Sequence, residues 1–496
     1  MKARPKNLKI IIDMLFSSII FLFQFLPLCL LLYFLAGKRL RNLLLLIASL
    51  VFYAWGESYY VLLMLVSILV NYLCGLMIDR YRGRQAARGF FIAAIAFNVL
   101  SISVFKYANF LVDNLNTLLS QVGVGPIELA PIHLPIGISF FTFQAMSYAV
   151  DVYRRDASVQ RSPLNIGLYI ALFPQLIAGP IIRYHDIAAQ LIRRRVRLDD
   201  FSYGIERFVV GLGKKVLIAN QVAIIADQIF SMPYETLTPG VAWLGVLCYT
   251  LQIYFDFSGY SDMAIGLGRM FGFHFLENFN YPYFSRSIRE FWRRWHISLS
   301  SWFRDYLYIP LGGNHAGPLR TYLNLLIVFF LCGLWHGASW NFVIWGLLHG
   351  LFLVIERLGF EKILNRCWSP LRHLYVMLVV CTGWVFFRTE NLSAAIHYLA
   401  AMAGLNPSLD LQQQPFVQVD FYIRLAIAAG ILFSTPVLRP LRGSIEGIIG
   451  IGRPKAADVL SGSIGILNTL ALAVLFYASV LFLAAGAYNP FIYFRF

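Results

Sequence analysis

Apolar segments about as long as a bilayer is thick recur along the whole chain, and this recurrence most constrains its fold. A bilayer core of about 30 Å requires roughly 20 apolar residues in a helix. Residues 321–355 contain no Lys, Arg, Asp or Glu at all. Charged residues make up only 13% of the chain, against about 25% in soluble proteins. The sequence therefore predicts an all-α integral membrane protein without a soluble domain of normal size.

The apolar segments lie near residues 15–36, 42–55, 59–78, 89–105, 133–150, 163–182, 204–226, 240–257, 321–336, 340–358, 371–387, 421–439 and 464–486. Several are too short to cross a bilayer alone, so we expect about ten to twelve crossings. We expect one multi-helix membrane domain over residues 14–496. Residues 1–13 form a possible leader, with Met14 as an alternative start. No clear small-residue cleavage site ends the first apolar run, which favours a retained helix over a signal peptide.

The basic loops predict how the chain is oriented in the membrane. The loop RYRGRQAAR (80–88) holds four arginines and no acid, which places it in the cytoplasm. Lys106 is the one Lys or Arg in the next long loop, about 106–132, so we expect that loop on the other side. Segment 133–150 is followed by the basic run 151–156, and segment 163–182 by the basic run 183–197. Both runs are expected in the cytoplasm, but a single crossing cannot have both ends on the same face. Pro174 and Gly179–Pro180 also break the second segment. A re-entrant hairpin, buried in protein or lining a cavity, resolves the conflict and suggests a central funnel.

A second basic region, residues 284–314, mixes arginines with Trp and Phe. This mixture is typical of a helix that lies along the headgroups at the membrane surface. Its arginines could hold an anionic donor at the cytoplasmic mouth; the candidates are Arg289, Arg293, Arg294 and Arg304.

The net charge of +16 does not indicate a nucleic-acid partner. The arginines lie in short clusters between apolar segments, where charge sets membrane orientation. The six cysteines show no metal-ligand spacing either. We therefore expect neither nucleic-acid binding nor a metal site.

His336 is the most informative residue of the charge-free stretch. A buried imidazole costs free energy unless its nitrogens find partners. A helix entering the membrane at Arg320 would carry His336 roughly 24 Å inward at 1.5 Å per residue. An ordinary core histidine bonded to a carbonyl remains the alternative, and Gly333 and Gly337 leave space beside it. An ionisable residue inside the membrane is by default a candidate site, here a general base that deprotonates a hydroxyl.

A few further polar residues are candidates for the same interior. His296 lies in the basic region, where an ordinary interfacial role is the alternative. Acids within apolar sequence usually face a cavity or pair with a base, and an ion pair with an arginine of the 286–304 run is an equally good interpretation. Gly259 and Gly266 permit close helix packing there. The cavity candidates are Asp256, Ser258, Asp262 and Asn341.

A dense series of motifs identifies a family resemblance. The motifs include FYAWG (52–56), KYANF (106–110), FPQLIAGPI (173–181), YFDFSGYSDMAIGLG (254–268) and LWHGASWNFVIWGLLHG (334–350). The chain resembles the membrane-bound O-acyltransferase family, in its bacterial alginate O-acetyltransferase branch, with a family core at about 100–390. The resemblance implies a helical fold around a funnel, with His336 of the WHG motif as the catalytic residue and His296 of the WHISLS motif as a second.

The resemblance also implies a reaction and a location. Acetyl-CoA would be the acetyl donor, used as a substrate rather than a bound cofactor. The acetyl group would cross the bacterial inner membrane to an exported polysaccharide, with alginate as the expected polymer. Delivery would use periplasmic acetyltransferases of the SGNH or alginate-modifying type, and membrane lipids surround the protein.

Three alternatives remain open, and one is a purely scaffolding role, in which neither Asp256 nor His336 matters as long as the protein recruits its partners. Cellulose, another exopolysaccharide or peptidoglycan could replace alginate as the acceptor. In a different class of protein, a transporter would move an acylated intermediate without chemistry, and Asp256 and Asp262 would then matter more than His336.

Overall fold

The computed structural model describes residues 15–315, 317–406, 417–437, 454–486 and 488–491, and side chains only from residue 462 onward in the last long helix. Throughout these ranges the secondary structure is helical, with no strand, as expected. The helices of the first half are α2 (Leu26–Leu35), α3 (Arg41–Glu57), α4 (Val61–Arg80), α5 (Gln85–Ile102), α6 (Ala108–Gln121), α7 (Ile138–Arg154), α8 (Pro163–Ala171), α9 (Phe173–Leu176), α10 (Tyr184–Ile192), α11 (Leu198–Gly213) and α12 (Asn220–Phe230).

The second half is also helical. Its helices are α13 (Pro239–Met270), α14 (Ile288–Arg294), α15 (Ile297–Phe303), α16 (Pro318–His336), α17 (Trp340–Ile355), α18 (Glu361–Leu364), α19 (Ser369–Arg388), α20 (Leu392–Met402), α21 (Phe421–Phe433) and α23 (Pro454–Ala484). Short π-helical segments join several of them, namely η1 (Phe21–Phe25), η3 (Ser103–Tyr107), η4 (Lys214–Ala219), η7 (Arg304–Tyr308) and η8 (Glu356–Phe360). Single 3₁₀ turns complete the set, namely η2 (Ser58–Tyr60), η5 (Tyr234–Thr236) and η6 (Pro282–Phe284).

Eight helical runs of the described chain are long and apolar enough to cross a membrane, which confirms a multi-pass membrane protein. They are Arg41–Arg80, Gln85–Gln121, Leu198–Phe230, Pro239–Met270, Pro318–His336, Trp340–Leu364, Ser369–Arg388 and Gly462–Ala484. The first run, 40 residues long, leaves helical geometry at Ser58 and so contains the two helices α3 and α4. Phe21–Leu35 and Phe421–Phe433 are apolar but shorter. The expected total of ten to twelve crossings stays a prediction.

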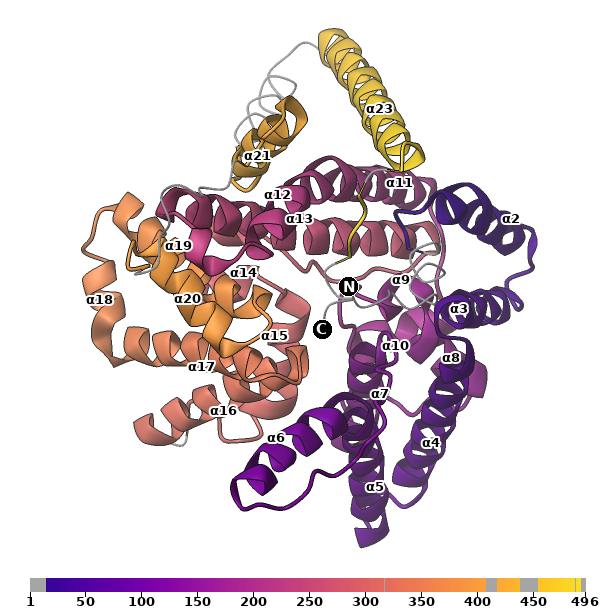
Figure 1. The fold of residues 1–496 in the computed structure, drawn as a ribbon. Coiled ribbons are helices and arrows are strands. Elements are labelled where there is room, and N and C mark those ends of the chain that lie inside the picture. Colours follow the sequence, from indigo (N-terminus) through magenta and orange to yellow (C-terminus); the bar gives the residue numbers. More distant parts are fainter. Residues whose placement is uncertain (1–14, 316, 407–416, 438–453, 487, 492–496) are drawn as a thin grey trace.

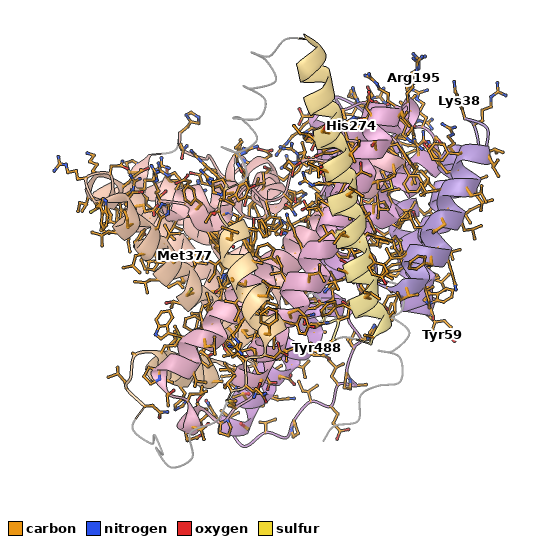
Figure 2. All side chains as sticks on the ribbon, turned by 90° about the horizontal axis from the view of Figure 1, so that it is seen from above. Lys38, Tyr59, Arg195, His274, Met377 and Tyr488 are labelled. Carbon is orange, nitrogen blue, oxygen red and sulfur yellow. The ribbon has the colours of Figure 1, made fainter. Side chains whose placement is uncertain are left out.

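The helices surround the middle of the molecule (Figure 1). Helices α3 to α8 form one side, α16 to α20 the opposite side, and α11 to α13 join the two. Asn489 near the C-terminus donates a hydrogen bond to the carbonyl of Ser17 near the N-terminus (3.1 Å), so the two ends of the described chain meet. Figure 2 shows Lys38, Arg195 and His274 toward one edge, and Tyr59 and Tyr488 further toward the opposite side. The first edge includes the basic run 193–197 expected in the cytoplasm.

The predicted break within residues 163–182 is present. Helix α8 ends at Ala171, a short helix α9 follows, and residues 177–183 are not helical. Leu172 (φ −54°, ψ 113°) makes the first break, directly before Phe173–Pro174. The side chains of Leu172, Phe173 and Leu176 are fully buried. Non-helical backbone at this depth is thus covered by protein, as the re-entrant interpretation requires.

The expected loop at 106–132 is only partly a loop. Helix α5 continues through the π-helical segment η3 into α6, which reaches Gln121. A π-helical turn inserts one residue into the helix and shifts the side chains that follow. Lys106 therefore lies on a long helix rather than in a polar loop.

The aromatic and basic region 284–314 forms two short helices, α14 and α15, instead of one surface helix. Several of its aromatic side chains are covered by protein: Phe291 is 0%, Trp295 3% and Trp302 7% exposed, whereas Phe284 is 37% exposed. Trp302 stacks on Phe143 of α7, with ring centroids 3.8 Å apart. The region therefore connects the interior to the edge of the molecule, and its arginines lie nearer the surface than its aromatic rings.

Candidate active site

His336 is the last residue of α16, and it lies in an aromatic surround. Gly337 is extended (φ −166°, ψ 153°), so the helix ends directly after the imidazole. The imidazole is 7% exposed and its ring lies 4.9 Å from Trp335, 4.9 Å from Trp345 and 5.1 Å from Phe387, centroid to centroid. Its ring nitrogens form no hydrogen bond within the part of the chain that the structure describes. The imidazole is thus buried with its nitrogens available for a substrate.

Gly333 and Gly337 do not leave open space beside His336, contrary to our expectation. A Cβ at Gly333 would lie 2.3 Å from the Phe342 carbonyl oxygen, and one at Gly337 would lie 2.2 Å from the Phe342 ring. The glycines instead let α16 and α17 pack closely as a hairpin. This packing holds the end of α16 in place.

Lys106 and Tyr107 satisfy the last carbonyls of α16. The ammonium group of Lys106 donates hydrogen bonds to the carbonyl of Trp335 and, at 3.1 Å, to that of His336. The Tyr107 hydroxyl donates to the carbonyl of Leu334 at 2.6 Å. The final carbonyls of a helix have no partner within it, and a cation there also interacts favourably with the helix dipole. These two side chains therefore fix the backbone that carries His336.

Our sequence analysis did not propose Lys106 or Tyr107 as site residues. The available signal was a lysine at the end of an apolar helix, within the KYANF motif. A charged group at that position requires a buried partner. The partner lies about 230 residues away in sequence, as the 2.6–3.1 Å contacts to residues 334–336 show.

His296 is held in one orientation and one tautomer. Its Nδ1 lies 3.1 Å from Asn278 Oδ1, and the same oxygen accepts a hydrogen bond from the backbone N–H of Ser298 (3.2 Å). Because an N–H can only donate, Oδ1 is an acceptor, and Nδ1 of His296 must carry the proton. Nε2 then presents a lone pair. This nitrogen is buried and has no partner among the described residues.

Burial also keeps His296 neutral. It lowers the pKa of His296 to about 3, so the imidazole is uncharged at neutral pH. The backbone of His296 is in the left-handed region (φ 42°), which is uncommon for a residue with a side chain and which is often found at functional sites. Trp335 contacts both histidines: its ring centroid lies 6.1 Å from that of His296 and 4.9 Å from that of His336. The structure therefore brings the two predicted histidines to one indole ring.

The broken segment after α9 contacts the same site. The backbone N–H of Ile181 donates to Ser298 Oγ at 2.9 Å, and that hydroxyl donates to Asn278 Oδ1 at 2.9 Å. The Asn278 amide in turn donates to Ser261 Oγ of α13 at 2.9 Å. A single buried hydrogen-bond network around His296 therefore links the GPII turn (179–182), the WHIS residues (295–298) and α13.

His349 on α17 is a third buried histidine that we did not predict. It is 0% exposed, and both of its ring nitrogens lack a partner in the described ranges. Its ring lies 5.2 Å from those of Trp292 and Trp345, and the indole N–H groups of both tryptophans are also unpaired there. Buried polar groups normally have partners. The interior beside His336 thus offers several nitrogens for hydrogen bonds with a substrate.

Asp256 and Asp262 form ion pairs, but not with the arginines of the 286–304 run that we had considered. Asp256 pairs with Lys215 at 2.6 Å, and both side chains are at most 2% exposed. Asp262 pairs with Arg207 at 2.7 Å and Lys214 at 2.6 Å. All three bases lie on α11 and η4, which pack against α13.

Close glycine contacts explain these partners. A Cβ at Gly259 would lie 2.7 Å from the Gly211 carbonyl oxygen, and one at Gly266 would lie 2.5 Å from that of Gly204. The backbones of α11 and α13 therefore approach closely, as Gly259 and Gly266 had suggested, and place the bases of one helix beside the acids of the other.

The two remaining cavity candidates are Asn341 and Ser258. The Asn341 amide donates to the Thr389 carbonyl (2.8 Å) and so ties α17 to the end of α19. Its Oδ1 has no partner within the described chain. Ser258 is 1% exposed, and its hydroxyl likewise has no partner there.

Three of the four candidate donor-binding arginines are already paired. Arg289 pairs with Glu361 (2.9 Å), Arg294 with Glu290 (2.6 Å) and Arg304 with Asp305 (2.6 Å). Arg293 is exposed and forms no ion pair among the described residues. Of the four, Arg293 is therefore the guanidinium most available to an incoming anion. No group of three or more His, Cys, Asp or Glu side chains that could hold a metal occurs in the described ranges.

Comparisons with known proteins place this geometry in context. The model of the membrane-bound O-acyltransferase family matches residues 47–379. The chain is 44% identical to the probable alginate O-acetylase AlgI of Pseudomonas putida, across 97% of this chain and all of that protein. It is 34% identical to the peptidoglycan O-acetyltransferase of Helicobacter pylori, across 97% of this chain and 98% of that protein. A teichoic acid D-alanyltransferase of Bacillus subtilis is 30% identical over 51% of this chain and 68% of its own length.

Proposed function

The chain belongs to the membrane-bound O-acyltransferase family, and on that basis we propose that it acetylates an exported polysaccharide, alginate, from the bacterial inner membrane. Relatives that match nearly its whole length carry the name probable alginate O-acetylase AlgI, at 44% identity over 97% of the chain. The peptidoglycan O-acetyltransferase is less similar, at 34%. The acetyl donor is cytoplasmic acetyl-CoA, used as a substrate.

The observation that carries the proposal is the position of His336. A buried imidazole with available nitrogens ends a membrane-spanning helix, and two side chains hold that helix end in place. This arrangement suits a general base that must meet a hydroxyl at a fixed distance. His336 takes the hydroxyl proton as the oxygen attacks the thioester carbonyl. The C–O bond forms, the C–S bond breaks, and the proton passes to the departing sulfur.

His296 is the second histidine of the proposed site and assists the reaction as a hydrogen-bond acceptor. Its Nε2 lone pair is fixed by the Asn278 bond, and its low pKa keeps the imidazole neutral. It can therefore accept a hydrogen bond from the acceptor hydroxyl or the donor amide, but it carries no positive charge. His336 then remains the residue that takes the proton.

The donor approaches through the basic region 284–314. Its phosphates meet Arg293, whose guanidinium is not engaged by a carboxylate within the described chain. The acetyl thioester end of the donor reaches along the buried aromatic residues to His296 and His336, where the acetyl group leaves sulfur for the acceptor hydroxyl. Periplasmic acetyltransferases of the SGNH or alginate-modifying type receive it on the other side.

A deletion strain that carries variants tests the proposal. We expect His336→Ala to abolish O-acetylation of the exported alginate while protein level and polymer export stay normal. Normal acetyl content in this variant would refute the role of His336. If the deletion leaves alginate acetylation intact but removes acetyl groups from peptidoglycan or cellulose, the acceptor is wrong and the chemistry stands.

The transporter alternative predicts a different pattern. A carrier that depends on a membrane carboxylate would fail in Asp256→Asn and tolerate His336→Ala. Because Asp256 is paired with Lys215 at 2.6 Å, we expect Asp256→Asn to lower protein stability without a specific loss of acetyl transfer per folded molecule. Loss of export in Asp256→Asn together with normal acetylation in His336→Ala would favour the transporter.

A further inference from the structure

A basic pocket lies on the surface where the loop after α4 meets the start of α5 and the end of α7. Its volume is about 440 Å³. The residues that line it come from two segments about 70 positions apart in the chain, and they are Ile78, Arg82, Gly83, Arg84, Gln85, Ala87, Arg88, Val152, Tyr153 and Arg155. None of them is acidic.

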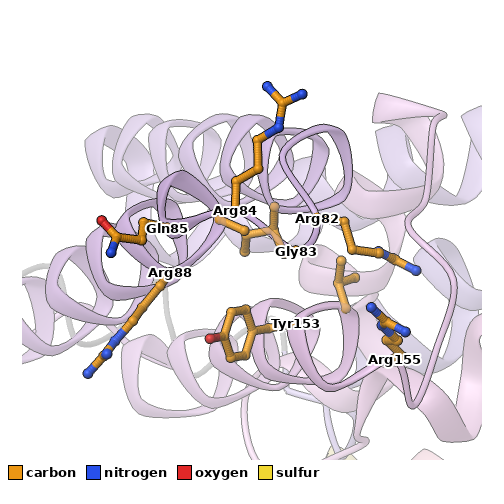
Figure 3. A pocket seen from close by; sticks show the side chains of 10 residues that line it. Arg82, Gly83, Arg84, Gln85, Arg88, Tyr153 and Arg155 are labelled. Carbon is orange, nitrogen blue, oxygen red and sulfur yellow. The ribbon is translucent and has the colours of Figure 1, made fainter.

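The side chains around this pocket divide into a charged rim and an apolar part. Arg82 and Arg155 lie on one side of it and Arg88 on the other, with the Tyr153 ring between them, whereas the Arg84 side chain points away (Figure 3). Ile78, Ala87 and Val152 are at most 5% exposed. A ligand here would meet guanidinium groups at its edges and hydrocarbon beneath.

The positive charge of the rim is only partly neutralised. Arg82 pairs with Asp79 at 2.7 Å. Arg88 and Arg155 form no ion pair among the residues that the structure describes. The neighbouring Arg154, by contrast, is engaged by the protein, because it donates to the Asp305 carbonyl at 2.9 Å. Arg155 follows the last residue of α7 in the left-handed conformation (φ 71°), and it lines the pocket.

The surroundings indicate where the ligand comes from. Outward-facing residues just below the pocket are apolar and exposed, namely Leu69 (55%) and Leu73 (47%) on α4 and Ile92 (53%) on α5. In a membrane protein such surfaces face acyl chains, so the pocket lies at the level of the headgroups. The arginines of this loop also predict the cytoplasmic leaflet, where anionic lipids are found.

The positive-inside rule explains why arginines are present here, but it does not require that they gather. The rule depends on the number of basic residues in a loop and not on the direction of each side chain. Arg155 comes from a different segment, yet it lines the same pocket as Arg82 and Arg88. Guanidinium forks match the oxygens of a phosphate group, and basic pockets between membrane helices bind lipid headgroups.

We propose that this pocket binds the phosphate-containing headgroup of an anionic phospholipid, with Arg155, supported by Arg82, on one side of the headgroup and Arg88 on the other. The acyl chains lie along the apolar surface of α4 and α5. Binding of this lipid is independent of acetyl transfer at His336, so the two proposals fail separately.

Native mass spectrometry of the full chain in detergent tests the proposal, with phosphatidylglycerol as the probe and phosphatidylcholine as the neutral comparison. We expect Arg88→Gln and Arg155→Gln each to weaken phosphatidylglycerol binding about tenfold, equivalent to about 1.4 kcal/mol. The matched control is Arg195→Gln, which removes the same charge from an exposed arginine outside the pocket. Its Kd should change less than about twofold, a difference well under 1 kcal/mol.

Three results would overturn the proposal. Equal weakening of phosphatidylglycerol binding in Arg195→Gln would mean that the overall positive charge of the protein, and not this pocket, attracts the lipid. Equal affinity for phosphatidylcholine would mean that the pocket does not select an anionic lipid, since phosphatidylcholine carries the same phosphate but no net charge. Displacement of phosphatidylglycerol by inorganic phosphate or by CoA at equal occupancy would assign the pocket to a soluble anion. All the residues changed are exposed arginines, so loss of folding does not complicate these comparisons.

Discussion

Replacing Lys106 by Met removes the ammonium group that holds the end of α16 and keeps most of the side-chain volume. The ammonium group donates to the carbonyls of Trp335 and His336. A hydrogen bond from a charged donor contributes about 1.5–3 kcal/mol, and removing it leaves buried carbonyls without a partner. We expect the free energy of unfolding to fall by about 2–3 kcal/mol. A shift of about 1 Å at His336 would also slow the reaction by up to about 100-fold.

The assay is polymer acetyl content per folded protein in a deletion strain, together with thermal unfolding in detergent. Asn98→Leu is the matched control on the same helix, because it breaks a buried amide pair with Asn71 (2.7 Å) away from His336. It should lower stability by a similar amount and leave acetylation per folded protein unchanged. Lys106→Arg keeps the charge and should recover part of the activity. Equal loss of acetylation in Lys106→Met and Asn98→Leu would refute the positioning role.

Three further predictions concern stability. Lys215→Met removes the ammonium group that pairs with the buried Asp256 (2.6 Å) and should cost about 3–5 kcal/mol in unfolding measurements. The double variant with Asp256→Asn should recover part of this loss, and an additive loss would contradict the prediction. The hydrogen bond to Asp151 (3.0 Å) is the main cause that raises the pKa of His185 above 6.5. The pair therefore stabilises the fold fully below about pH 6.5, and this stabilisation is lost as the pH rises through the raised pKa. The melting-temperature difference between wild type and His185→Gln should be larger at acidic than at alkaline pH, and a constant difference would refute this prediction. Gly346→Ala places a Cβ 2.2 Å from the Phe329 carbonyl oxygen and should cost about 1–3 kcal/mol, while Gly465→Ala, with nothing within 4 Å, should be neutral by the same melting assay.

The sequence predicted the features that depend on local chemistry. Apolar run lengths predicted the helical membrane fold, and Pro174 with Gly179–Pro180 predicted the broken segment. His336 was identified because an ionisable residue stood in a charge-free stretch, although its catalytic role remains a proposal. Gly259 and Gly266 predicted close packing, which the contacts with Gly211 and Gly204 confirm.

Features that depend on pairing between distant segments could not be predicted. Lys106 was placed in a loop because its carbonyl partners lie about 230 residues further on, and the π-helical turn that aims it has no simple sequence signal. An ion pair with an arginine of the 286–304 run was one interpretation of Asp256 and Asp262. Helix packing set by glycines instead brings Lys215 to Asp256, and Arg207 and Lys214 to Asp262. His349 was overlooked because burial with two unpaired nitrogens is visible only in three dimensions.

The central claim is that His336 acts on an acetyl thioester. It is tested most directly by mixing purified full-length protein in lipid nanodiscs with labelled acetyl-CoA and the acetyl acceptor, and following thioester cleavage. We predict that the wild-type protein cleaves the thioester and transfers the label. His336→Asn, which keeps a polar side chain of similar size but has no basic nitrogen, should reduce that rate at least about 100-fold, the lower end of the usual contribution of a general base. Cleavage at the wild-type rate in His336→Asn would contradict the account.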